Sequence, residues 1–214
     1  MYKRQSYYDS SVYTLSNTVD QSIIWVHVND GIVTGSSDTA LKKLEQLKGC
    51  LEIKWNDGLN SMVGVKIQRT PDGFELIQPK LIDKILRDSW DGTTTRQTPL
   101  PEGFNSNFVA GESGVQASEY LSLIGSLNYV SIGTRPDITY GVNCLARFSS
   151  RPSSVHWKAL KHLIGYVAAT KDCVLSIQPN KDSLLPVDCF VDANWGGPSS
   201  RSTYGVLIRL YGCP

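Results

Sequence analysis

Basic side chains gather in one stretch of this sequence, and contact with phosphate is the chemistry that such a stretch suits. Between residues 135 and 171 the only acid is Asp137, whereas six residues are Lys or Arg and two are His. Phosphate contacts dominate the affinity of proteins for nucleic acid. We assign a nucleic-acid surface to five members of this stretch, Arg147, Arg151, Lys158, Lys161 and His162. A solvated helical face is the alternative.

Two acidic residues stand beside amides where strand-like patterns end. Asp30 follows Asn29 after the apolar stretch 21–28, and Asp192 precedes Asn194 after the stretch 184–191. Hard cations such as Mg²⁺ prefer oxygen ligands of this kind. Taken alone, however, Asn29-Asp30-Gly31 is the sequence of a tight hairpin turn, and an isolated Asp after a strand is more often a turn residue.

The first 90 residues predict two hairpins and two helices that would position the first of these acids. β-Branched and aromatic residues over 21–28, the turn at 29–31 and the apolar residues 32–34 predict a hairpin. Apolar spacing predicts a helix over 39–51, capped by Asp38. A second hairpin is predicted over 62–77 around Thr70-Pro71-Asp72-Gly73, where the glycine would accept a positive φ. A helix over 80–87 follows.

The remaining residues predict helices in the middle and strands near the end. Residues 91–118 have no periodicity and are interpreted as a linker. Helices are predicted after Ser118, after Pro136 and after Ser153-Ser154, and the small residues around Gly125 would allow close packing. Strands are predicted over 184–191 and 203–210.

Composition places the protein among soluble globular chains. It has 214 residues and a net charge of +1, which gives no overall signature of a nucleic-acid-binding protein. The five cysteines are widely spaced and include no Cys-x-x-Cys pair, so we expect reduced thiols and no zinc site. No signal peptide or membrane-spanning run is found, so cytoplasm or nucleus is the expected location, with no membrane partner.

One long motif resembles a known family. Residues 122–171 read SLIGSLNYVSIGTRPDITYGVNCLARFSSRPSSVHWKALKHLIGYVAATK. Without gaps, they resemble the segment that joins polymerase to ribonuclease H in the Pol polyproteins of copia-type LTR retrotransposons. The resemblance implies that the chain holds the C-terminal part of the reverse transcriptase and the start of ribonuclease H.

The resemblance also implies an α+β fold in four parts. Residues 1–90 would form the C-terminal part of the reverse-transcriptase palm, with β-hairpins and a helix, and residues 62–86 resemble the family's primer-grip hairpin and following helix. Residues 91–117 would be a linker and 118–182 the helical thumb or connection. Residues 183–214 would be the N-terminal fragment of a ribonuclease H-like domain, seen as an incomplete β-hairpin.

The same resemblance assigns catalytic positions. His27-Val28-Asn29-Asp30 occupies the place of the family's Tyr-x-Asp-Asp motif, whose first Asp joins another Asp from an earlier strand in a two-Mg²⁺ polymerase site. Asn29 replaces the first Asp, a principal metal ligand, and only Asp30 remains. Asp192 matches the first metal-binding Asp of the ribonuclease H site, and Asn194 replaces a commoner Asp.

The functional expectation follows from these replacements. The family consists of RNA-directed DNA polymerases with ribonuclease H, acting on an RNA/DNA template-primer. This chain is expected to be a fragment or decayed copy without activity, holding no Mg²⁺ stably at Asp30 or Asp192. A retained nucleic-acid-binding module is the alternative. The ends of the chain are expected to be prone to aggregation, because they form hairpins with unpaired edges.

Overall fold

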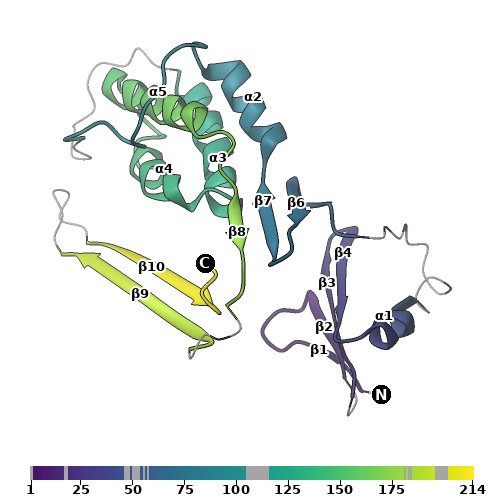
Figure 1. Ribbon diagram of the computed structural model, residues 1–214. Helices are drawn as coiled ribbons and strands as arrows, with labels where there is room; N and C mark the ends of the chain where they lie inside the picture. The colour runs from purple at the N-terminus through teal and green to yellow at the C-terminus, as the bar shows by residue number, and fades with distance from the viewer. Residues whose placement is uncertain are drawn as a thin grey trace. The chain divides into compact units, whose positions relative to one another are not determined.

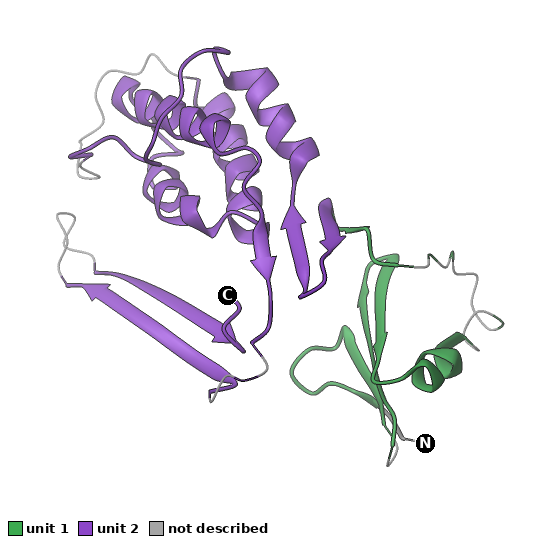
Figure 2. Cartoon of the chain, viewed as in Figure 1, with its two compact units in different colours: residues 1–63 green, residues 64–214 purple. Residues whose placement is uncertain are grey.

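The computed structural model describes residues 2–16, 19–45, 58–104, 116–180, 185–195 and 202–214, together with positions 49, 54, 56 and 182. Figure 1 shows a mixture of helices and antiparallel strands. The chain divides into two compact units, residues 1–63 and 64–214 (Figure 2). The predicted linker, residues 91–117, includes positions 105–115, and these lie outside the described residues.

Unit 1 is an antiparallel sheet with one helix packed on it. The strands β1 (Tyr2–Gln5), β2 (Val12–Ser16), β3 (Gln21–His27) and β4 (Asp30–Gly35) pair in sequence order. Helix α1 (Asp38–Glu45) packs on β3 and β4 and buries Ala40 and Leu44. The two-residue strand β5 (Ser61–Met62) ends the unit.

The first hairpin is confirmed, but its turn lies one residue earlier than predicted. His27 pairs with Asp30 and Val26 with Gly31, so the turn consists of Val28 and Asn29. Asp30 and Gly31 therefore belong to β4. In the predicted helix 39–51, α1 covers the first part, and positions 46–48 and 50–51 lie outside the described residues. Ser37 and not the predicted Asp38 caps α1, since the Ser37 Oγ accepts a hydrogen bond from the Ala40 N–H at 3.1 Å and Asp38 is the first residue of the helix.

Unit 2 contains a sheet that joins distant parts of the chain. The second predicted hairpin is confirmed as β6 (Val65–Arg69) and β7 (Phe74–Ile77). Strand β8 (Leu175–Ile177), which was not predicted, pairs antiparallel with β7. This pairing attaches the hairpin to the helices, so the structural division falls after residue 63, whereas the sequence placed a boundary after residue 90.

Gly73 shows why a glycine stands in the β6–β7 turn. Its φ is not among the positive ones, contrary to the prediction. A Cβ at this position would instead collide with the backbone carbonyl of Ile177 in β8. The glycine is required by the close approach of another strand rather than by turn geometry.

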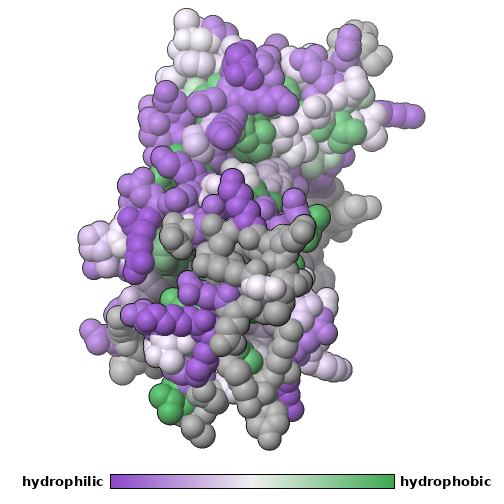
Figure 3. Space-filling view, turned by 90° about the vertical axis from the view of Figure 1, so that its right-hand side faces the viewer, coloured by the Kyte–Doolittle hydropathy of each residue, from purple (hydrophilic) through white to green (hydrophobic). Residues whose placement is uncertain are grey.

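On the face drawn in Figure 3, hydrophilic residues predominate and hydrophobic ones form small separate patches. Within the described residues, no helix combines the length and the apolar character needed to cross a bilayer.

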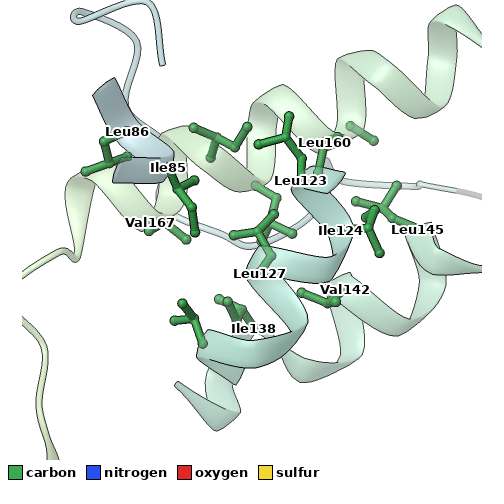
Figure 4. Close-up of a cluster of buried hydrophobic side chains, with 14 of the residues drawn as sticks. Ile85, Leu86, Leu123, Ile124, Leu127, Ile138, Val142, Leu145, Leu160 and Val167 are labelled. Atoms are coloured by element: carbon green, nitrogen blue, oxygen red, sulfur yellow. The ribbon is translucent and has the colours of Figure 1, made fainter. Parts of the chain in front are cut away.

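Four α-helices and one 3₁₀ turn enclose the main hydrophobic core (Figure 4). They are α2 (Pro79–Ser89), α3 (Ala117–Gly133), η2 (Pro136–Ile138), α4 (Thr139–Ala146) and α5 (Ser154–Ala169). The core residues lie at helical spacing, and Leu127, Leu145 and Leu160 are fully buried. The predicted helices are confirmed, and Pro136 opens η2 directly before α4.

Two details of the predicted helices differ. Helix α3 begins at Ala117 with Gln116 as the cap, so Ser118 lies inside the first turn. Nothing among the described residues lies within 4 Å of a Cβ built at Gly125, so this glycine does not serve close packing there.

The described part of the predicted linker, residues 91–104, packs against the helices. The Arg96 N–H donates to the Gly165 carbonyl at 3.2 Å, and the Trp90 Nε1–H donates to Thr94 O at 2.7 Å. Leu100 and Phe104 contact the core. The absence of periodicity thus reflects irregular backbone that covers α5.

The last two strands form a separate two-stranded sheet. They are β9 (Val187–Asn194) and β10 (Thr203–Leu210), which pair antiparallel along their whole length. The strand predicted over 203–210 is confirmed as β10, whereas the strand predicted over 184–191 begins at Val187 and continues to Asn194, so Asp192 lies within it and not after it. Residues 183–184 and 196–201 lie outside the described part.

Candidate functional site

The tip of the β3–β4 hairpin presents Asn29 and Asp30, the first predicted catalytic pair. Asn29 is one of the two turn residues, and Asp30 begins β4; both are exposed. Val28, the other turn residue, has a φ of 54°. A β-branched residue in this left-handed region is strained. The hairpin therefore holds one carboxylate and one neutral amide at a sharply turned, solvent-exposed tip.

The second predicted catalytic residue, Asp192, lies in the β9–β10 sheet. It is exposed and pairs with Gly205, while Asn194 pairs with Thr203 at the end of the strand. Asp188 lies four residues earlier in β9, on the same side of the sheet as Asp192. Its carboxylate accepts hydrogen bonds from Arg209 Nε at 2.8 Å and from Arg209 Nη2 at 2.7 Å. This ion pair lowers the pKa of Asp188.

Neither acid belongs to a group that fits a metal centre. Among the described residues, no three His, Cys, Asp or Glu side chains lie together in a way that could hold a metal ion. Two divalent cations need several convergent anionic oxygens. The donor set around Asp30 and around Asp192 does not fit a two-Mg²⁺ site in the described part of the chain.

Four of the five predicted nucleic-acid-binding residues are exposed, and three of these lie at the end of α4, on α5 and in the turn between them. Arg147 is the C-cap of α4, Arg151 lies in the turn, and Lys158 lies on the outer side of α5. The one acid between residues 135 and 171, Asp137, is bound to Arg135. Apart from Asp137, the sequence between residues 135 and 171 contains no acid.

The other two residues hold the 89–98 segment against α5. Lys161 Nζ donates to the Ser89 carbonyl at 2.7 Å and lies 5.3 Å from the centre of the Trp157 ring. His162 Nε2 donates to the Thr98 carbonyl at 2.9 Å. Ser89 ends α2, so Lys161 also supplies a cation at a helix C-terminus, where it is favourable.

His162 contributes little positive charge at neutral pH. Burial lowers its pKa below the ordinary 6.5, the hydrogen bond to Thr98 opposes this, and the nearby charge of Arg96 adds to the lowering. Its ring is therefore neutral at pH 7. Lys161 is exposed as well, but its ammonium group is bonded to the Ser89 carbonyl, so we call the other three exposed residues, Arg147, Arg151 and Lys158, the basic surface.

The motif Thr134-Arg135-Pro136-Asp137-Ile138 has a structural role that sequence reasoning missed. Arg135 is only 2% exposed and donates through Nε and Nη2 to the Asp137 carboxylate at 2.9 and 2.7 Å. It also donates to the carbonyl and the hydroxyl of Thr170, the C-cap of α5, at 2.9 and 2.6 Å. Arg135 is thus an internal clamp and not a phosphate ligand.

His156, which the sequence placed among the basic residues, caps α5. It is fully buried, and its Nδ1 accepts a hydrogen bond from the Ser153 N–H at 3.0 Å. Its ring stacks on Phe148 with 3.8 Å between ring centres. The predicted capping role of Ser153 is confirmed at the N-cap position of this helix.

A shallow hollow of about 450 Å³ lies between α2 and the C-terminal end of α5. Its charged lining residues are Asp83, Arg87 and Lys171, with Trp90 as the aromatic member. The charges are mixed and the hollow is open, so it resembles a surface groove more than an enclosed substrate pocket.

Several of the similar known proteins are retrovirus-related Pol polyproteins from transposons. The Pol polyprotein of transposon RE2 from Arabidopsis thaliana is 30% identical over 208 residues, which cover 94% of this chain and 14% of that polyprotein. The Pol polyprotein of transposon TNT 1-94 from Nicotiana tabacum is 29% identical over 203 residues, 89% of this chain and 15% of that polyprotein.

A shorter relative matches over most of its length. An uncharacterised mitochondrial protein of Arabidopsis thaliana is 34% identical over 192 residues, which cover 88% of this chain and 78% of that protein. No family model and no solved structure matches significantly. The chain spans about 14% of the length of the transposon polyproteins. The chain thus belongs to the retrovirus-related Pol polyproteins of copia-type LTR retrotransposons.

Proposed function

We propose that this chain is a catalytically inactive, decayed segment of a copia-type Pol polyprotein. It corresponds to the C-terminal part of a reverse-transcriptase palm, a helical thumb or connection and the first hairpin of a ribonuclease H-like domain. Membership of the Pol family and the order of the motifs along the chain support this proposal.

The observation that carries the proposal is the neutral side chain of Asn29 at the β3–β4 tip. An amide offers a carbonyl oxygen without negative charge, whereas Mg²⁺ and the charge that develops in nucleotidyl transfer need anionic ligands. Asp30 is the single carboxylate of the tip. No group of three metal-binding side chains exists in the described residues to compensate.

Primer extension tests the absence of polymerase activity. The whole chain is incubated with an RNA template, a DNA primer, nucleotides and either Mg²⁺ or Mn²⁺. We expect no product from the unaltered chain or from Asn29→Asp, since one restored carboxylate leaves the group of metal ligands incomplete. Reproducible extension that Asp30→Ala abolishes would refute the proposal.

Ribonuclease activity is tested in the same way on an RNA/DNA hybrid. We expect no cleavage, because Asp192 does not belong to any group of three or more metal-binding side chains among the described residues. Cleavage that depends on Asp192, shown by its loss in Asp192→Asn, would contradict this expectation.

A second function, binding of nucleic acid without catalysis, is supported by the basic surface. Arg147, Arg151 and Lys158 are exposed, and the single acid between residues 135 and 171, Asp137, is bound to Arg135. A phosphate backbone suits such a surface, and its affinity would fall steeply with salt. Lys161 and His162 contribute through packing of the 89–98 segment instead.

Fluorescence anisotropy with a labelled RNA/DNA hybrid at several salt concentrations tests this second function. Replacing one phosphate-binding side chain should reduce the slope of log affinity against log salt by about 1. We expect this for Arg151→Gln and Lys158→Gln. Lys84→Gln, an exposed lysine of α2, is the matched control and should leave the slope unchanged. Equal effects of all three variants would reject a specific basic surface.

A further inference from the structure

The β9–β10 sheet has one face made entirely of uncharged, largely apolar side chains. Paired residues of antiparallel strands project to the same side, and successive residues alternate between sides. The register therefore sorts the residues into two faces. One face, which we call the apolar face, holds Val187, Cys189, Val191, Ala193, Tyr204, Val206, Ile208 and Leu210.

The opposite face carries the charges. It holds Asp188, Phe190, Asp192, Asn194, Thr203, Gly205, Leu207 and Arg209. Arg209 binds Asp188 and lies 4.6 Å from the centre of the Phe190 ring. This face thus has internal partners for its cation and one of its acids, and it suits solvent.

The apolar face is exposed to solvent in the described structure. Val191 is 67% exposed, Ile208 58% and Val206 51%, and Tyr204 reaches 76%. In unit 1, by contrast, α1 covers β3 and β4. Sheets normally bury their apolar face under a second layer. The separation of apolar and charged side chains onto opposite faces therefore indicates that another element packs on the apolar face.

We propose that the apolar face is a self-association surface on which a second copy of this chain packs, hairpin against hairpin. A two-fold axis brings each patch against its own equivalent. The apolar face has no Lys, Arg, Asp or Glu, so its equivalents meet without like-charge repulsion. If two copies packed through their opposite faces instead, the Asp192 carboxylates of the two copies would approach each other. The net charge of +1 adds little long-range repulsion between copies.

The size of the face determines how strong the dimer is. Eight residues per strand span roughly 26 Å, and two neighbouring strands about 4.8 Å apart form a strip roughly 10 Å wide. Two strands of this length bury roughly 400 Å² on each copy, which is below the ~800 Å² per partner of a standard stable interface. The dimer is therefore weak and concentration-dependent, with an expected dissociation constant of about 10–100 µM.

Sedimentation equilibrium of the whole chain between about 1 and 200 µM tests the proposal, since this range spans the expected constant. Ile208→Lys places a charge on the apolar face. The matched control, Leu207→Lys, changes the neighbouring residue of the same strand, which lies on the opposite face and is 44% exposed against 58%. Both variants carry the same new charge in the same exposed strand.

We expect Ile208→Lys to raise the dissociation constant at least about tenfold, the effect of a charge left unpaired in an apolar contact. Leu207→Lys should change it less than about threefold, because the new charge lies on the opposite face, outside the contact. A chain that stays monomeric over the whole range would overturn the proposal. Equal weakening by both variants, or association that Ile208→Lys leaves intact, would also overturn it.

Thiol crosslinking gives a second readout that does not depend on a charge substitution. Cys189 lies on the apolar face and is exposed, so a short bismaleimide should link two copies of the unaltered chain. The covalent dimer should disappear in Cys189→Ser and persist in Cys173→Ser, which alters an exposed cysteine outside the hairpin. Loss of the product in both variants, or in neither, would contradict packing through this face.

Discussion

Arg135 binds Thr170 from 35 residues away and thereby closes the C-terminal end of α5, with 2.9 Å between Arg135 Nη1 and the Thr170 carbonyl oxygen. The last carbonyls of a helix have no partner within the helix. Arg135 supplies one, together with a cation at the negative end of the helix dipole. Arg135 Nε and Nη2 also donate to the Asp137 carboxylate. One buried side chain therefore joins the segment after α3 to the end of α5.

The clamp predicts that lysine cannot replace arginine here. Arg135→Lys should reduce the free energy of unfolding by about 2–3 kcal/mol, because a single ammonium cannot reproduce the planar fork that bonds Asp137 and Thr170 together. Urea unfolding followed by the helical circular dichroism signal measures this. Arg151→Lys, at an exposed turn position, is the control and should change the value by less than about 0.5 kcal/mol. A similar small change in Arg135→Lys would contradict the clamp.

The same ion pair predicts loss of stability in acid. Burial raises the pKa of Asp137, but hydrogen bonds and charge from Arg135 outweigh it and hold the pKa below the ordinary 3.8. The folded state thus binds this proton less readily than the unfolded state. The stabilisation is fully present above the ordinary pKa and is lost as the pH falls through the lower, folded value.

Unfolding measured from pH 6 down to about pH 2, a window that includes the carboxylate titration, checks this expectation. Asp137→Asn should lower stability near pH 6 and weaken its dependence on pH below 3.8, the ordinary pKa. The Asp137 side chain is 39% exposed, so solvent screens part of the effect. An unchanged acid profile in Asp137→Asn would show that other carboxylates dominate.

Local patterns in the sequence predicted most helices and hairpins, because apolar spacing and turn residues are local signals. The α3 stripe through Tyr120, Leu123 and Leu127 is buried as expected. Strands β1, β2 and β8 were missed. They are short, and β8 exists through its pairing with β7, about 100 residues earlier in the chain. No local pattern encodes such a pairing.

For the candidate site, the sequence identified the residue types but not their partners. Lys161 and His162 sit in a basic stretch, and sequence spacing does not show that the carbonyls of Ser89 and Thr98 lie above them. Arg135 was counted with the basic residues although its charge is used internally. Whether a long basic side chain points to solvent or bonds another part of the protein depends on contacts between segments that are distant in the sequence.

One prediction compares two exposed lysines of α5, Lys158 and Lys161, of which Lys161 donates to the Ser89 carbonyl. Lys161→Gln should lower the free energy of unfolding by about 1 kcal/mol, because it removes the charged donor to Ser89 and the cation over Trp157. Lys158→Gln should leave stability within about 0.5 kcal/mol, as for other exposed positions. Thermal unfolding of both variants measures this. Equal losses would show that Lys161 has no special structural role.

Gly73 provides a test of the β7–β8 junction. Gly73→Ala should destabilise the protein by about 1–3 kcal/mol, because the added methyl collides with the Ile177 backbone, which is held in β8. Gly125→Ala is the matched control in α3, where the methyl meets nothing in the described structure. That change should stabilise by about 0.5–1 kcal/mol through helix propensity. Tolerance of Gly73→Ala would mean that β8 does not pair closely with β7.

The β3–β4 turn holds a strained residue whose relief can be measured. Val28 has a φ of 54°, and this left-handed conformation costs an L-residue roughly 1–2 kcal/mol. Val28→Gly removes that strain but adds freedom to the unfolded chain, so a net gain of about 0.5–1 kcal/mol is expected. Val26→Gly, in the extended strand β3, should destabilise instead.

Hydrogen exchange of the β3 and β4 amides reports on this unit alone, since local opening sets their protection. Protection should rise in Val28→Gly and fall in Val26→Gly, and a fall in both would show that the turn is not strained.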